Sequence, residues 1–158
     1  MVIIRDTREK RGFTFLSCAA DVTVKAGTLV SGDYSLLGME SMVAIERKSM
    51  DDFMQSISTG RERFFRELDR ARGLQAFAIL VEGDWKSIVH GNYRSQMSPA
   101  AASATVAAIM ARYGFPVFFA GSHDLAERMA VLFLRQFLRR KEHEIEVFRH
   151  AVDDNAKG

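Results

Sequence analysis

The segment Ile45-Glu46-Arg47-Lys48-Ser49-Met50-Asp51-Asp52 combines strand-forming residues with a dense group of charges. Apolar residues alternate with their neighbours at its start, which predicts a strand over residues 42–48. Successive side chains of a strand point to opposite faces, so Glu46 and Lys48 share one face and Arg47 lies on the other. We expect this strand end, where a carboxylate and an ammonium lie side by side, to hold a divalent cation and a phosphate together.

Two further carboxylates are expected near this strand end. Asp33 follows Gly32, which permits a sharp turn, and it lies 13 positions before Glu46, enough for a hairpin that returns beside the strand. Asp52 would open the next helix and face the same pocket. Three carboxylates around Lys48 form an oxygen-rich set of the kind that Mg²⁺ or Mn²⁺ requires, without the thiolates or imidazoles typical of zinc sites.

A simpler interpretation of these residues also exists. An isolated Glu-x-Lys triplet is commonly a salt-bridged pair in a surface hairpin, because short motifs often occur by chance. Asp52 also suits the first turn of a helix capped by Ser49, where acidic side chains interact well with the helix dipole.

The wider combination of motifs is more specific than any one of them. In order, the chain carries Asp6-Thr7-Arg8-Glu9, Gly32-Asp33-Tyr34, Glu46-Arg47-Lys48 with Asp52 four residues later, and Gly60-Arg61. This set resembles the nuclease domain of the XPF-type structure-specific endonuclease family, whose pattern is V/I-E-R-K, three free positions and D. The resemblance extends over about residues 2–140. It implies a restriction-endonuclease-like fold and DNA cleavage with a divalent metal ion.

The resemblance also implies roles for individual residues. Asp33, Glu46, Asp52 and the backbone carbonyl of Arg47 would hold one or two Mg²⁺ or Mn²⁺ ions. Lys48 would position the nucleophile and stabilise the transition state.

Other charged residues are expected to support this site. Asp6, Arg8 and Glu9 correspond to a motif at the rim of the active site, although a charged turn with a local ion pair also explains them. Arg8, Arg47 and Arg61 would support the carboxylates or clamp flanking phosphates through two-pronged contacts.

Basic residues around the site are the expected DNA-binding residues: Arg8, Arg61, Arg63, Arg66, Lys86 and Arg94. On the helix predicted over residues 49–73, however, the arginines alternate with acidic residues, a pattern that is also typical of a solvated, salt-bridged face. Residues 86–97 are predicted to be a surface loop.

Periodicity predicts an α/β fold with a central mixed sheet of about five strands flanked by helices. Strands 21–29, 34–37 and 42–48 are expected to be adjacent and antiparallel. A helix over residues 49–73 is expected to break at residues 58–60, and the strand over residues 76–82 is expected at the centre of the sheet because it is apolar on both faces.

The domain organisation is expected to be simple. Residues 1–152 would form one nuclease domain and residues 153–158 a frayed tail, without the helix-hairpin-helix module usual in the family, as in stand-alone prokaryotic or viral versions. The helix from Asp124 has a wide apolar set that includes Val131 and Leu134, which indicates either a homodimer through this C-terminal helix or a broad core-facing stripe.

Composition limits the class of protein. With 47% hydrophobic and 27% charged residues the chain is globular rather than disordered, and it has no apolar run of the ~20 residues that span a membrane and no signal-peptide core. A single cysteine, Cys18, excludes an internal disulfide and favours the cytoplasm. The histidines at positions 90, 123, 143 and 150 lack zinc-ligand spacing and are expected at the surface. Because net charge is only +2, DNA binding requires basic residues gathered on one face.

These expectations combine into one function. The sequence predicts an Mg²⁺-dependent DNA endonuclease of the cytoplasm and nucleoid, acting on branched, flap or fork-like DNA in repair or recombination. The alternatives are a non-cleaving DNA-binding subunit and a nuclease acting on mismatches, linear duplex or RNA.

Overall fold

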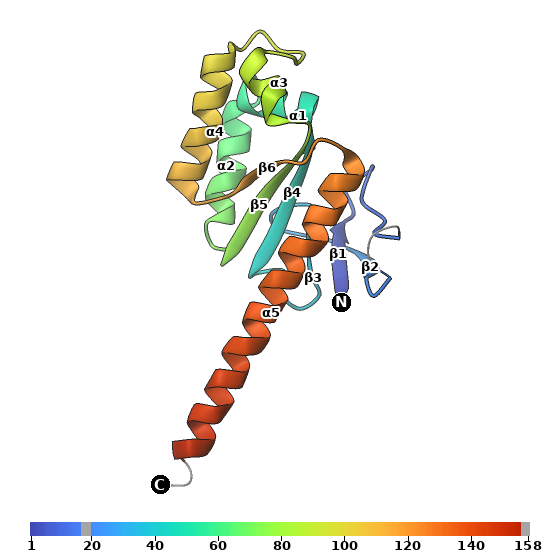
Figure 1. The fold of residues 1–158 in the computed structure, drawn as a ribbon, viewed down its shortest axis with the longest axis vertical. Helices are drawn as coiled ribbons and strands as arrows, with labels where there is room; N and C mark the ends of the chain where they lie inside the picture. Colours follow the sequence, from blue (N-terminus) through green and yellow to red (C-terminus); the bar gives the residue numbers. More distant parts are fainter. Residues whose placement is uncertain (17–19, 156–158) are drawn as a thin grey trace.

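The computed structural model describes residues 1–16 and 20–155, and within them it has a six-stranded sheet. The strands are β1 (Val2–Asp6), β2 (Thr23–Gly27), β3 (Tyr34–Leu36), β4 (Val43–Ser49), β5 (Ala76–Glu82) and β6 (Val117–Phe119). Their order is β2-β1-β3-β4-β5-β6 (Figure 1). β3 pairs antiparallel with β1 and β4, whereas β1 and β2, and β4, β5 and β6, are parallel. The predicted mixed sheet is therefore confirmed, with one strand more than expected.

Helices cover both faces of the sheet. They are α1 (Met50–Ile57), α2 (Arg61–Ala71), α3 (Trp85–His90), α4 (Pro99–Tyr113) and α5 (His123–Asn155). One hydrophobic core joins α5 to the sheet, and a second joins α1, α2, α3 and α4 to the opposite face (Figure 1). Among the described residues, no helix combines the length and the apolar character needed to cross a membrane.

β5 has the central position that its sequence predicts. Ala78 and Leu80 belong to the core under α5, whereas Ile79 and Val81 belong to the core under the other helices. All four are fully buried. Burying a Val, Leu or Ile side chain stabilises the fold by about 1.5–3 kcal/mol, so Ile79, Leu80 and Val81 favour a position for β5 between two helical layers.

The position of β2 differs from the prediction. Residues 21–29 were expected to form a hairpin with residues 34–37, but β2 pairs parallel with β1 at the edge of the sheet, and β3 lies between β1 and β4. The side chains of β2 are exposed or half-buried, as suits an edge, whereas β1 is mostly buried and has a neighbour on each side.

The helix boundaries confirm one prediction and correct another. α1 ends at the expected break, where the backbone N–H groups of Ser58 and Gly60 bond to carbonyls of the last turn. Residues 86–97, predicted to be a loop, begin within α3, which Asp84 caps by accepting a hydrogen bond from the Ser87 N–H at 2.7 Å. A helix of six residues is too short to show a clear period in the sequence.

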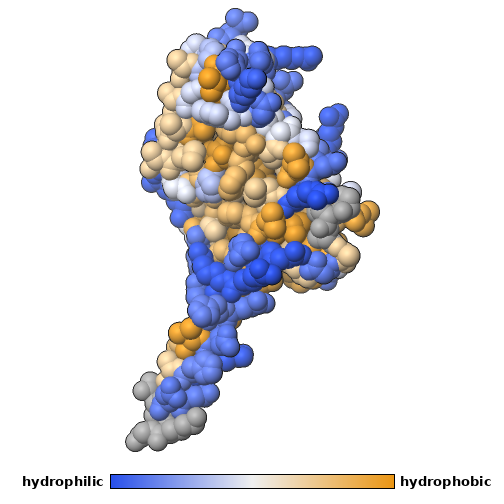
Figure 2. Space-filling model, viewed as in Figure 1, coloured by the Kyte–Doolittle hydropathy of each residue, from blue (hydrophilic) through white to orange (hydrophobic). Residues whose placement is uncertain are grey.

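α5 also differs from the prediction. Residues 153–155, expected in a frayed tail, are helical, and residues 156–158 and Cys18 lie outside the described residues. Val131 and Leu134 are buried against the sheet, so the broad core-facing stripe is the correct interpretation for them. The distal half of α5 projects beyond the body of the domain (Figure 1), and its visible surface is mostly hydrophilic (Figure 2).

Candidate active site

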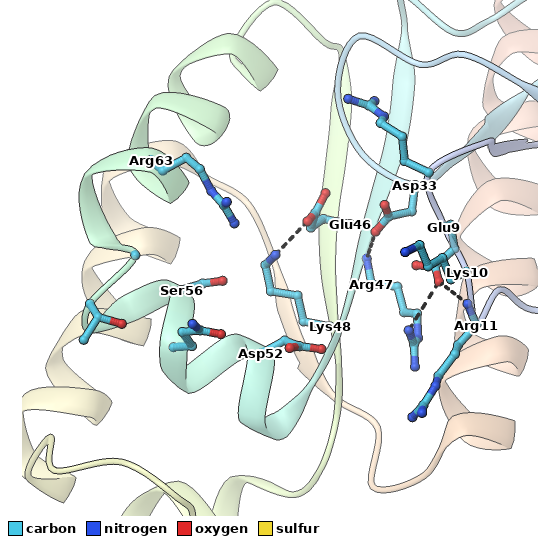
Figure 3. A pocket seen from close by; sticks show the side chains of 14 residues that line it. Glu9, Lys10, Arg11, Asp33, Glu46, Arg47, Lys48, Asp52, Ser56 and Arg63 are labelled. Atoms are coloured by element: carbon cyan, nitrogen blue, oxygen red, sulfur yellow. Dashed lines mark hydrogen bonds and ion pairs between the residues drawn. The ribbon is translucent and has the colours of Figure 1, made fainter.

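The end of β4 presents its charges as the alternation predicts. Glu46 and Lys48 point toward α1 and α2, where the Lys48 Nζ donates a 2.8 Å hydrogen bond to Glu46 Oε1 and lies 4.9 Å from the centre of the Phe64 ring (Figure 3). Arg47 points to the opposite face and pairs with Glu82 on β5. The predicted register of this strand is confirmed.

A tight backbone contact places Asp33 beside Glu46. Gly32 has a φ of 76°, and a Cβ there would lie 2.8 Å from the Ile45 carbonyl oxygen, so only glycine fits. The Asp33 N–H donates to the same carbonyl at 2.7 Å, and the Arg47 N–H donates to Asp33 Oδ2 at 2.8 Å. The backbone of β4 thereby holds the carboxylate of Asp33 next to that of Glu46 (Figure 3).

The two carboxylates are held in an environment that disfavours their charge. Burial, and then repulsion from Glu46, raises the pKa of Asp33 to about 8. Burial also raises the pKa of Glu46, although Lys48 opposes the shift. A hard divalent cation would lower the pKa values of both carboxyl groups, because its positive charge would stabilise their ionised oxygens. These two residues therefore fit such an ion.

Asp52 lines the same cavity but has a local partner. It accepts a 2.7 Å hydrogen bond from the Ser49 hydroxyl, and the Asp52 N–H donates to that hydroxyl at 3.1 Å, so it also belongs to the cap of α1. Across residues 1–16 and 20–155, no group of three or more Asp, Glu, His or Cys side chains is close enough to hold a metal ion. The structure thus brings Asp33 and Glu46 together and leaves Asp52 apart from them on α1 (Figure 3).

An open cavity of about 720 Å³ lies over these residues. Its rim is basic and its far wall is formed by α1 and the turn that follows it; the lining includes Arg8, Lys10, Arg11, Arg63, Gln55, Ser56, Thr59 and Gly60. Lys10 and Arg11 were not predicted. They directly follow the Asp6–Glu9 motif, so the density of charge after β1 is the signal that could have identified them.

Asp6 and Arg8 form the local ion pair that was one of the two interpretations. The Arg8 Nε donates to Asp6 Oδ1 at 2.7 Å and Nη2 donates to Oδ2 at 3.0 Å, which holds the pKa of Asp6 at about 2. Arg8 Nη2 also donates to the Leu29 carbonyl at 2.8 Å. Because the Arg8 side chain remains 70% exposed and lines the cavity, this pair orients it toward a ligand as well.

The opposite face of β4 carries a cluster of charged residues. From the sequence, Arg47 was expected to reach an acidic partner across the sheet or a phosphate, but Glu82 and His123 were not predicted as members of the cluster. The Arg47 Nε and Nη2 donate to the two oxygens of Glu82 at 2.7 and 2.6 Å. Arg47 Nη1 lies 3.5 Å from a Glu9 oxygen, and His123 Nδ1 lies 2.6 Å from Glu82 Oε1. Glu82 and His123 come from β5 and α5, so only the fold shows that they meet. His123, expected only as a surface residue, therefore joins this cluster.

The other predicted DNA-binding residues lie in different surroundings. The guanidinium of Arg61 lies 4.5 Å from the centre of the Phe65 ring and donates to Thr105 Oγ1 at 3.2 Å, so it ties α2 to α4 and does not support the carboxylates. Arg63 lines the cavity. The remaining three are Arg66, which lies 3.9 Å from Glu62; Lys86, which is exposed on α3; and Arg94, which lines a hollow next to Gln55 and Thr59.

The chain is similar to known proteins in both sequence and structure. The model of the ERCC4 domain family matches residues 5–133. XPF from Aeropyrum pernix superposes with a TM-score of 0.65 and 24% sequence identity over 89% of this chain and 61% of that chain. XPF from Aeropyrum pernix in complex with DNA superposes with a TM-score of 0.64 and 25% identity over 90% of this chain and 66% of that one.

The chain spans about two thirds of the length of these XPF chains or slightly less. No curated protein sequence matches it significantly. The matched interval contains every residue of the site described above. The resemblance and the restriction-endonuclease-like fold expected from the sequence are confirmed, and the chain belongs to the ERCC4 domain family.

Proposed function

We propose that this protein is a metal-dependent DNA endonuclease that hydrolyses phosphodiester bonds. The observation that carries the proposal is the pairing of Asp33 with Glu46 beside the Lys48 ammonium, on the floor of an open cavity with a basic rim. Family membership and the similarity to an XPF structure that contains DNA support the same conclusion.

The chain's own residues would divide the work. Asp33, Glu46 and the backbone carbonyl of Arg47, with Asp52 nearby, would hold Mg²⁺ or Mn²⁺, which would activate a water and offset the phosphate charge. Lys48 is held by Glu46, so its remaining N–H groups can orient the attacking water and stabilise negative charge on the phosphorus-bound oxygens.

The substrate belongs to the same proposal. We infer that the protein cuts branched, flap or fork-like DNA during repair or recombination. It would do so in the cytoplasm, in association with the nucleoid. The test is a panel of labelled flap, fork, nicked, Holliday-junction, linear and RNA substrates with Mg²⁺ or Mn²⁺. Cleavage of branched DNA in preference to the linear duplex is expected. Preferential cutting of linear duplex or RNA would identify another substrate, and binding without any cleavage would identify a non-cleaving subunit.

We propose that a homodimer forms through the distal half of α5, because Val131 and Leu134 of the proximal half are buried in the core. Ile145, Phe148 and Val152 are exposed there at spacings of three and four residues, so they share one face of the projecting helix. This face is the surface that a second copy of the helix would cover in a dimer.

Light-scattering chromatography tests this arrangement. The wild-type chain is expected to be a dimer, and Phe148→Glu is expected to be a folded monomer because Phe148 supports no part of the core. A wild-type monomer at micromolar concentration would contradict the homodimer.

A further inference from the structure

A second groove meets the first at the proposed active site. This groove has a volume of about 450 Å³ and shares Asp33, Glu46, Lys48, Arg8 and Arg63 with the larger cavity. It then continues away from α1, between the turn at residues 30–32 and α2. The carboxylates therefore lie at a junction, and a strand that crosses them has an open path on the α2 side.

Arg70 lines the far part of this groove. Its side chain is exposed, and it has no hydrogen-bond or ion-pair partner within residues 1–16 and 20–155. The neighbouring arginines of α2 differ, because Arg63 lies 3.6 Å from Glu67 and Arg66 lies 3.9 Å from Glu62. Arg70 is thus a cation in this groove, and no described residue balances its charge through a direct contact.

The spacing along α2 fits a nucleic-acid strand. Arg63 and Arg70 are seven residues apart, close to two full turns, so they share a face and are separated by about 10.5 Å along the helix axis. Successive phosphates of one strand advance by about 3.4 Å along a duplex, so that separation spans about three nucleotides. Arg66 is rotated by about 60° from Arg63 and is not among the groove's lining residues.

We propose that the strand flanking the cleaved bond runs through this second groove and that Arg70 binds one of its phosphates, about three nucleotides beyond the phosphate that lies at Arg63. The inference rests on the proposed nuclease function and adds to it a defined path for the substrate. Glu67 also lines the groove and repels phosphate. The path is therefore one phosphate position at Arg70 rather than a continuous basic track along α2. Because phosphates carry no base identity, the contact positions the strand without reading its sequence.

The test compares Arg70→Ala with Arg72→Ala. Both remove an exposed arginine from the C-terminal end of α2, where Arg72 is the C-cap, but only Arg70 lines the groove. On a fork substrate that the wild type cuts, Arg70→Ala is expected to raise KM about 5- to 20-fold with kcat changed less than about two-fold, as loss of one charge-assisted phosphate contact predicts. The slope of log affinity against log salt should fall by about 1. Arg72→Ala should match the wild type in all three measurements, because Arg72 lines neither the groove nor the larger cavity.

A scan of the substrate locates the phosphate itself. Neutral methylphosphonates are placed singly at each position within four nucleotides of the mapped cut. Among the positions where wild-type affinity drops, one should lie on the side of the cut that enters the groove, and Arg70→Ala should show no further loss at that position alone. Additive losses, or equal behaviour of the two arginine variants, would overturn the inference while wild-type cleavage leaves the nuclease proposal intact. A wild type that cuts none of the substrates would remove both.

Discussion

The two faces of β4 carry charge in opposite ways. On the α2 side, Asp33 and Glu46 share one ammonium, that of Lys48, and their pKa values are raised by burial. On the α5 side, burial opposes ionisation of Glu82, but hydrogen bonds and attraction from Arg47 outweigh it and lower the pKa of Glu82. One face holds two carboxylates whose ionisation is disfavoured, at an open cavity, and the other holds a nearly closed set of ion pairs.

This difference indicates separate roles for residues adjacent in the sequence. A bound cation favours the ionised form of carboxyl groups whose pKa values burial has raised, so the Glu46 face is suited to a cationic ligand. The Arg47 face is already satisfied through bidentate contacts, so its side chains fix the backbone at residues 46–48 from behind. Because the Arg47 N–H also donates a hydrogen bond to Asp33, the ion pairs on the Arg47 face help to position the carboxylate on the Glu46 face.

The largest expected effect comes from the cavity face. Glu46→Gln and Asp33→Asn keep size but remove a charged oxygen ligand, so single-turnover cleavage should fall at least ~10²-fold while DNA binding persists. Lys48→Ala should abolish turnover with metal affinity almost unchanged. Wild-type rates for either carboxylate variant in saturating Mg²⁺ would show that this face is not the active site.

A smaller effect, on stability, is expected from the opposite face. Arg47→Ala leaves Glu82 without its main partner and should lower the free energy of unfolding by about 2 kcal/mol, less than the ~3–5 kcal/mol typical of fully buried pairs because both side chains retain some contact with water. Arg47→Lys should restore little, since a point charge cannot make the two-pronged contact. Urea unfolding measures both variants.

Activity separates positioning from direct action at Arg47. Its loss should weaken cleavage through a displaced β4, so saturating DNA should not restore the rate. Full recovery at saturating DNA would mean instead that Arg47 binds the substrate, and the comparison of the two faces would fail.

The sequence predicts the two faces because alternation is a local property. Glu46, Lys48 and Arg47 follow directly from period two, and Gly32 marks the turn that returns Asp33 to them. The partner of Arg47 is not local: Glu82 is 35 residues away on a parallel strand, and the β4–β5 pairing that brings it near depends on a helical crossover.

The same limit explains the other errors. β2 carries a weak alternating pattern that suits a hairpin with β3 as well as a parallel edge beside β1, and only the packing of β1 decides between them. Arg61 follows a predicted helix break near the site, but its direction depends on Phe65 and on Thr105 of α4, 44 residues away.

The dependence of stability on pH should sharpen the comparison further. The pKa of Asp33 is raised from its ordinary value of 3.8 to about 8, so the folded state binds this proton more tightly than the unfolded chain does. The resulting stabilisation is complete below about pH 4 and is lost as the pH rises through about 8. Thermal unfolding between pH 5 and 9 should show this decline, reduced in Asp33→Asn. Added Mg²⁺ should oppose it, because the ion binds the ionised carboxylate. An unchanged pH profile in Asp33→Asn would contradict the assigned shift.

The smallest effect is expected at the outer edge of the satisfied face. His123 Nδ1 lies 2.6 Å from Glu82, but the side chain is 43% exposed and Arg47 already bonds both oxygens of that carboxylate. Solvent screening leaves such a pair worth about 0.5 kcal/mol, so His123→Ala should lower the free energy of unfolding by about that amount. Cleavage should stay within about two-fold of the wild type, since neither Arg47 nor the backbone of β4 loses its contacts. Urea unfolding and single-turnover rates measure the two effects on one preparation. A ten-fold loss of cleavage with stability unchanged would show that the α5 face takes part in the chemistry, and the division of β4 into a ligand-binding face and a positioning face would then be wrong.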